Sequence, residues 1–143
     1  MSLFSTLRIS STGLTANRLW LDTIASNIAN ANTTRTPEGG PYRRQDVILA
    51  PQGRAGFSQF LGSANSTTAG QGVTVAGIAK DTSAPRMIYN PDHPDADANG
   101  YVAMPNINIV TEMVNMIAAQ RAYEANVTVI GAAKSMAVKS LEI

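Results

Sequence analysis

The sequence predicts an α+β protein in which long N- and C-terminal helices pair as a coiled-coil-like layer, with a small β-rich domain in the middle of the chain. All seven prolines fall between Pro37 and Pro105, and proline breaks a helix interior because it lacks the N–H group and clashes with the preceding turn. The proline-free segments on either side carry apolar residues at helical spacing. The chain accordingly divides into an N-terminal helix, a β-rich domain and a C-terminal helix at residues 1–33, 34–105 and 106–143.

The N-terminal segment carries one apolar row with a period near 3.5 residues, the spacing of helices that wrap around partners. The row consists of Leu3, Leu7, Leu14, Leu21, Ile24 and Ile28. Small neutral residues fill the rest of the helix surface, and its only charges are Arg8, Arg18 and Asp22. A solvated helix normally carries charged residues on its outer face. The C-terminal segment also carries few charges for its length, so we expect both terminal helices to be buried in an assembly.

The middle of the chain is rich in glycine and contains four short segments of strand character. Nine of the 11 glycines lie between Gly39 and Gly100. Four strands are expected, at Val47–Leu49, Val73–Ile78, Arg86–Tyr89 and Gly100–Ala103. Residues 52–72 are rich in Gly, Ser, Thr and Gln, so we expect a mobile loop there.

The C-terminal segment predicts a second long helix. Asn106 or Asn108 can cap its start, and Glu112 suits the positive end of its dipole. Its apolar row consists of Ile109, Met113, Met116, Tyr123, Val127, Ile130, Ala137 and Leu141.

Composition argues against several classes of protein. A net charge of +1 gives no basic field for nucleic acid, and the mild basic cluster of Arg35, Arg43, Arg44 and Arg54 is interpreted as a solvated loop face. No segment is apolar enough to insert into a membrane, and the start lacks the pattern of a cleavable secretory signal. There is no cysteine, and the single histidine has no recognisable nucleophile or acid beside it. We expect no enzyme and no catalytic, cofactor or metal site.

One alternative is a calcium-responsive binding module. Residues 95–100, Asp-Ala-Asp-Ala-Asn-Gly, copy the first half of an EF-hand loop, with Asp95, Asp97 and Asn99 as ligands. The twelfth position is Asn106, where the loop needs a bidentate Glu. An Asx-rich turn is the favoured interpretation.

Three asparagines gather at the expected end of the N-terminal helix, at Asn27, Asn30 and Asn32. Their amides can bind carbonyls of the last turn or of a neighbouring chain. A frayed helix end explains one such residue well and three poorly.

At these residues the chain resembles a known family. Residues 21–33, Leu-Asp-Thr-Ile-Ala-Ser-Asn-Ile-Ala-Asn-Ala-Asn-Thr, are similar to the N-terminal signature of bacterial flagellar rod, hook and hook-associated proteins. Residues 36–44, 89–97 and 120–126 resemble stretches of the proximal rod proteins within that family.

The resemblance implies a structural subunit of the flagellar basal-body rod, which is the tubular drive shaft of bacterial motility. It implies that the terminal helices form the inner layer of the tube, that the middle domain lies outside, and that the flagellar type III apparatus exports the chain without cleavage into the periplasmic basal body. The expected partners are further copies and other rod and axial proteins, with neither nucleic acid nor membrane insertion. The expected interface is Leu14, Leu21, Ile24, Ile28, Asn27, Asn30, Asn32, Met113, Met116, Tyr123, Val127, Ile130 and Leu141.

Overall fold

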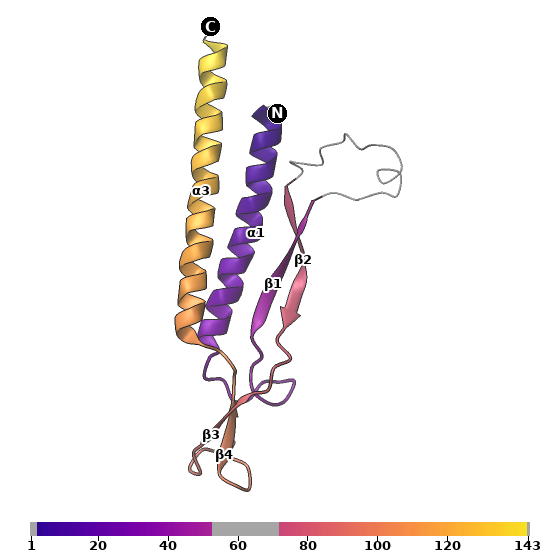
Figure 1. The fold of residues 1–143 in the computed structure, drawn as a ribbon, viewed down its shortest axis with the longest axis vertical. Coiled ribbons are helices and arrows are strands. Elements are labelled where there is room, and N and C mark those ends of the chain that lie inside the picture. Colours follow the sequence, from indigo (N-terminus) through magenta and orange to yellow (C-terminus); the bar gives the residue numbers. More distant parts are fainter. Residues whose placement is uncertain (1–2, 53–71, 143) are drawn as a thin grey trace, which may run out of the picture.

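The computed structural model describes residues 3–52 and 72–142, and it confirms an α+β fold. The elements in chain order are α1 (Leu3–Ala29), β1 (Gln45–Pro51), β2 (Val73–Lys80), β3 (Arg86–Tyr89), β4 (Tyr101–Met104) and α3 (Ile109–Leu141), as Figure 1 shows. All four expected strands are present. Most of the expected mobile loop, residues 53–71, lies outside the described residues.

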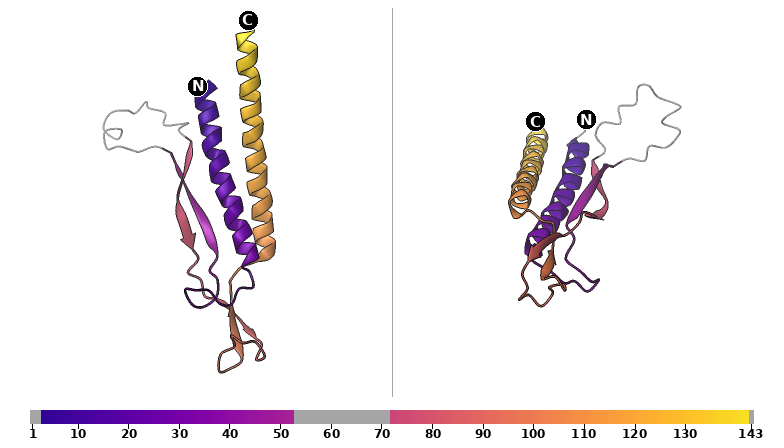
Figure 2. Two further views of the ribbon diagram at one scale, coloured as in Figure 1. Left: turned by 180° about the vertical axis from the view of Figure 1, so that it is seen from behind. Right: turned by 60° about the horizontal axis from the view of Figure 1, so that its bottom comes forward.

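The two helices lie side by side and run in opposite directions, so the start of α1 and the end of α3 are at the same end of the molecule (Figures 1 and 2). At 1.5 Å per residue, the 27 residues of α1 and the 33 of α3 span about 40 and about 50 Å. Asn108 is the N-cap of α3, and its Oδ1 accepts hydrogen bonds from the backbone N–H groups of Val110 and Thr111. The second of the two predicted caps is thus the one in use.

Strands β1 and β2 form an antiparallel hairpin that packs along α1, on the side away from α3 (Figures 1 and 2). The hairpin is tied to the helix at the start of β2, where the Val73 N–H donates to Oγ1 of Thr12 at 3.1 Å. A register shift lies between Ile48 and Leu49. Helix α1 is therefore covered on two sides by its own chain, whereas α3 is covered on one.

Strands β3 and β4 form a second antiparallel hairpin, at the end of the molecule opposite the two termini (Figure 1). The Tyr89 and Tyr101 rings face each other edge to face across it, with centroids 5.4 Å apart. Gly100 adopts a φ of 80° in the connecting turn, and a β-carbon there would lie 2.9 Å from the Tyr89 ring. Only glycine satisfies both conditions without strain.

The core is small and lies mainly between the helices. Ile24, Asn27 and Glu112 are among the largest fully buried side chains of the described residues. The other buried helical positions carry short side chains, at Ser10, Ala16, Thr23, Ala119 and Ala133. Ala16 lies on the side of α1 that faces β2. Short side chains between the helices, such as Ala119 and Ala133, permit a close approach of the two helix axes.

Candidate assembly interface

The predicted apolar row of α1 is only partly buried in the single chain. Ile24 is buried, whereas Leu14, Leu21 and Ile28 are half-buried. The large aliphatic residues therefore lie mostly at the flanks of the helix pair, and part of their surface stays open to a further partner.

The predicted row of α3 divides into two groups. Met116, Tyr123 and Ile130 are half-buried, while Met113, Val127 and Leu141 are exposed. Glu112, Ala119 and Ala133 are the buried residues of this helix. They fall on a seven-residue repeat that is offset from the predicted row. The exposed residues point away from the chain's own core and face no element of the described structure closely enough to be covered.

Two contacts fix the register of the helix pair. A β-carbon at Gly13 would lie 3.1 Å from the Asn126 amide, and the Asn27 side chain reaches the Glu112 carboxylate. From Gly13 to Asn27 is 14 residues forward along α1, and from Asn126 to Glu112 is 14 residues back along α3. That spacing is two heptads, as expected for an antiparallel pair with a 3.5-residue period.

Asn27 has no exposed surface, and its amide is saturated by groups of its own chain. Nδ2 donates to the Gln45 carbonyl at 2.8 Å and to Oε2 of Glu112 at 3.1 Å. Oδ1 accepts from the Gln45 N–H at 2.9 Å and from the Tyr42 hydroxyl at 3.1 Å. An amide has two donors and two acceptor lone pairs, so none is left for a neighbouring chain. This residue joins α1, β1 and α3.

Glu112 is the second member of this junction. Its side chain is 2% exposed, and Oε1 accepts from Nε of Arg44 at 2.8 Å. Burial lowers the pKa of the Arg44 guanidinium, but the hydrogen bond and charge of Glu112, with a smaller contribution from Asp46, outweigh burial and raise it overall. A buried carboxylate is tolerated when it is paired and hydrogen-bonded, and both conditions hold.

The other two asparagines of the cluster differ from Asn27. Asn30 donates to the Ser26 carbonyl of the last turn at 2.9 Å and accepts from the Thr33 hydroxyl at 3.1 Å. Asn32 is exposed. The three asparagines therefore differ in environment: Asn27 is buried at a junction of three elements, Asn30 caps the end of α1, and Asn32 lies on the surface.

The acidic loop between β3 and β4 forms local turns. Oδ1 of Asp97 accepts the backbone N–H groups of Asn99 and Tyr101, and Oδ2 of Asp95 accepts the Thr34 hydroxyl. Nδ1 of His93 accepts the Asp95 N–H. Within residues 3–52 and 72–142, no three His, Asp or Glu side chains gather so as to hold a metal ion.

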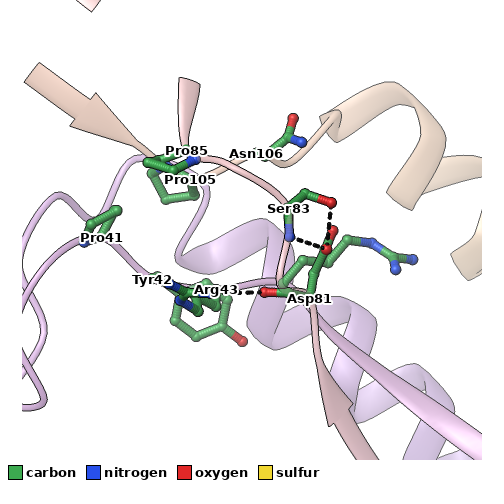
Figure 3. Close-up of a pocket in the computed structure, with 9 residues that line it drawn as sticks. Pro41, Tyr42, Arg43, Asp81, Ser83, Pro85, Pro105 and Asn106 are labelled. Carbon is green, nitrogen blue, oxygen red and sulfur yellow. Dashed lines mark hydrogen bonds between the residues drawn. The ribbon is translucent and has the colours of Figure 1, made fainter. Parts of the chain in front are cut away.

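A small hollow lies between the linker after β2 and the segment before β1 (Figure 3). Asp81 and Ser83 line one side of it, and Pro41, Pro85 and Pro105 line the other. Its volume is about 60 Å³, whereas sites for small molecules usually measure about 300 to 1,000 Å³. The Ser83 hydroxyl and N–H both donate to Oδ1 of Asp81, which lowers the pKa of that carboxyl. The hollow is therefore too small for a ligand site, and it arises where the linker after β2 packs on the segment before β1.

Comparison with known proteins relates both terminal segments of the chain to flagellar rod proteins. Residues 7–35 match the family described as flagella basal body rod protein, and residues 98–143 match the flagellar basal body rod FlgEFG protein C-terminal family. The flagellar basal-body rod protein FlgC of Borreliella burgdorferi is 51% identical over 100% of this chain and 98% of the relative. The chain belongs to the flagellar basal-body rod protein family.

More distant members match over the same extent. FlgC of Bacillus subtilis is 44% identical, covering all of this chain and 99% of the relative. FlgC of Salmonella typhimurium is 38% identical, covering all of this chain and 98% of the relative. The N-terminal family match spans most of α1 and the asparagine cluster, and the C-terminal match spans β4 and α3. The two matched segments are those that pack together as the helix pair.

No helix among the described residues of this rod-family chain is long and apolar enough to cross a membrane. Three of its arginines, Arg35, Arg43 and Arg44, lie within reach of Asp95, the Asp81 carbonyl and Glu112. Arg54, the fourth of the expected basic cluster, lies outside the described residues.

Sequence reasoning missed the junction of Asn27, Glu112 and Arg44. A signal was present, because Glu112 is the only charged residue between Asp97 and Arg121. An isolated charge in an apolar stretch of helix is either exposed or buried with a partner, and the sequence alone does not name that partner.

Proposed function

We propose that this chain is a structural subunit of the flagellar basal-body rod and that it polymerises through the outer surfaces of its terminal helices. The observation that carries the proposal is the first third of α3. Val110, Met113, Val114 and Ile117 are 70%, 54%, 60% and 58% exposed. They form one apolar stripe along α3, on the face opposite the buried residues Glu112 and Ala119.

Covering these residues supplies the free energy for assembly. Full burial of one large aliphatic side chain contributes about 1.5 to 3 kcal/mol. Soluble monomers rarely leave contiguous apolar surface of this kind uncovered. The exposed charges of α3 are few: Arg121, Glu124, Lys134 and Lys139. A helix that is largely apolar all round is typical of one enclosed by neighbours.

Three further points belong to this proposal. Residues 1–33 and 106–143 form the inner axial layer, and residues 34–105 lie on its outside. The partners are other copies and other rod and axial proteins. The chain reaches the periplasmic part of the basal body through the flagellar type III export apparatus, without cleavage of a signal. The proposed role is mechanical, and it needs neither catalysis nor calcium.

The predicted interface residues are part of the same proposal. Leu14, Leu21, Ile28, Met113, Val127 and Leu141 keep exposed or half-exposed surface that neighbours would cover. Asn27 contributes indirectly, because it holds the helices in the arrangement that presents those surfaces.

The substitution Val127→Asp tests the proposal. Val127 is 47% exposed, so the isolated chain should keep its helix content by circular dichroism and its thermal midpoint. Cells with this variant should form no completed rods and should not swim. Thr82→Asp is the matched control, since it places the same charge on an exposed residue of the linker between β2 and β3. Normal swimming by the Val127→Asp strain would refute the helix interface.

Export is tested separately by mass spectrometry of the chain recovered from isolated basal bodies. An intact N-terminal peptide, apart from loss of the initiator methionine, is the expected result. A fragment that begins well inside α1 would contradict export without cleavage.

A further inference from the structure

The β3–β4 hairpin is the part of the described chain with the least support from other elements. It lies beyond the helix pair, at the end opposite the two termini (Figures 1 and 2), and its strands pack on each other and on no helix. Met87, Tyr89 and Tyr101 are 52%, 65% and 43% exposed. An isolated two-stranded hairpin is marginally stable in water. Aromatic surface on such an element indicates a contact that the single chain does not make.

The tip of this hairpin is acidic. Asp92 and Asp97 are exposed, and Asp95 is half-buried beside Thr34. The sequence has no lysine or arginine between Arg86 and Arg121. Among the described residues, Arg35 forms an ion pair with this tip, and its Nη1 lies 3.9 Å from Oδ1 of Asp95. No hydrogen bond or ion pair engages the Asp92 side chain within the described part of the chain.

The opposite end of the molecule has the complementary character. Phe4 and Leu141 are 81% and 87% exposed, and Met136 is 59% exposed. Lys134 and Lys139 are exposed near the end of α3, and Arg8 is exposed on the first turns of α1. Among the residues described at this end, Glu142 is the one that carries a side-chain carboxylate. The open end of the helix pair is therefore apolar and basic, whereas the hairpin is aromatic and acidic.

We propose that the β3–β4 hairpin docks on the open end of the terminal helix pair of the next rod-family subunit along the axis. This inference rests on the proposed function, and it adds a contact that joins successive subunits along the rod axis. The two surfaces lie at opposite ends of the long axis, and a contact between different surfaces continues from subunit to subunit as a filament. Residues 98–143 match a family described for FlgEFG proteins, so a helix end of this kind is not confined to this chain.

Charge complementarity and apolar burial act together in this contact. Met87 and the two tyrosines cover the apolar helix ends, and Asp92 meets lysine or arginine at the rim. Carboxylates opposite the C-terminal lysines set the orientation of docking more than its strength.

A photo-crosslinking amino acid at position 89 tests the contact in intact basal bodies. Mass spectrometry should recover peptides from the first turns of an N-terminal helix or the last turns of a C-terminal helix of a rod-family subunit. The same probe at Thr82, which is exposed in the linker between β2 and β3, should not give these products. Crosslinks from position 89 to the middle of a helix, to another hairpin or to a protein outside the family would overturn the inference.

The substitution Asp92→Lys tests the charge of the tip. It should leave the thermal midpoint of the isolated chain unchanged and should lower the number of completed rods per cell by about tenfold, because it sets like charges against each other at the interface. Asp92→Asn should have a smaller effect, and Thr82→Lys should have none.

The results separate this inference from the proposed function. If Val127→Asp prevents rod formation while Asp92→Lys forms rods as the unmodified chain does, the axial contact is refuted and the helix interface stands. If neither substitution has an effect, both fail.

Discussion

Nδ2 of Asn27 donates a hydrogen bond to Oε2 of Glu112 at 3.1 Å, although the two residues are 85 positions apart in the chain. One residue lies at the end of α1 and the other in the first turn of α3. Through Gln45 and Arg44 the same two side chains also hold the start of β1. The junction therefore fixes the angle at which both helices leave the β-rich region. If subunits pack through their helices, as proposed, this angle has to be the same in every copy, because it sets where each neighbouring subunit binds.

Loss of the Glu112 carboxylate should destabilise the chain. Glu112→Ala removes the buried partner of Arg44, which keeps only its exposed partner Asp46, and one acceptor of Asn27. We therefore expect a loss of about 2 to 3 kcal/mol in the free energy of unfolding. Arg44 is 26% exposed by side chain, and water partly screens it, which keeps the loss below that of a fully buried pair. Urea denaturation measures it. Glu124→Ala is the control, since that carboxylate is half-exposed in a surface pair with Arg121 and should cost less than about 0.5 kcal/mol.

The three asparagines should respond differently to alanine. Asn27→Ala leaves the Gln45 N–H and carbonyl without their buried partner, which should cost at least about 2 kcal/mol. Asn30→Ala removes a bond at the helix end and should cost about 1 kcal/mol. Asn32→Ala should leave the unfolding midpoint unchanged, because the residue is exposed. Equal losses at all three positions would contradict the distinct roles that the structure gives them.

The helices and strands were predictable because their signals are local. Proline placement, apolar spacing and strand composition fix each element within a few residues, and Asn108 is a recognisable cap. The pairing of the two terminal helices was also predicted, and it is confirmed. The register of that pair and the places of the two hairpins were not predictable, because they depend on contacts such as Gly13 with Asn126, which join distant segments and leave no local pattern.

The predicted interface shows the same limit. Apolar spacing located Met116, Tyr123 and Val127 on one side of a helix, but it did not reveal which flank its own chain covers. The buried row of α3 consists instead of Ala119, Ala133 and Glu112. Small and charged residues contribute little to an apolar pattern. A search for apolar spacing therefore misses the row of α3 that packs closest to α1. Whether neighbours cover the exposed residues stays a prediction.

The Asp81 carboxyl should show a pH effect of known sign. The Ser83 hydroxyl and N–H hold its pKa below the usual 3.8. A lowered pKa stabilises the folded state above the pKa of the unfolded chain, and this contribution is lost as pH falls below about 3.8 through the folded value. NMR titration of Ser83→Ala should show the Asp81 pKa rising toward 3.8. The Glu38 pKa, which the Lys80 hydrogen bond and charge lower, serves as an internal control and should not move.

The two helical glycines should give opposite results when replaced. Among the described residues, nothing lies within 4 Å of the place that a β-carbon at Gly131 would take. Gly131→Ala should therefore stabilise the isolated chain by about 0.8 to 1 kcal/mol through helix propensity alone. At Gly13 the same gain is opposed by the Asn126 amide, 3.1 Å from the new methyl group. That amide donates to the Ala122 carbonyl at 2.9 Å and is not free to swing away without losing the bond.

Gly13→Ala should therefore be close to neutral, and Gly13→Leu should be strongly destabilising because it forces the helices apart at the centre of their contact. The pair of alanine variants measures how closely the helices approach, since both substitutions make the same chemical change in a helix interior. Thermal unfolding of the isolated variants decides the matter. Equal stabilisation by Gly13→Ala and Gly131→Ala would show that α1 and α3 do not pack closely at Asn126, and the antiparallel register drawn from that contact would be wrong.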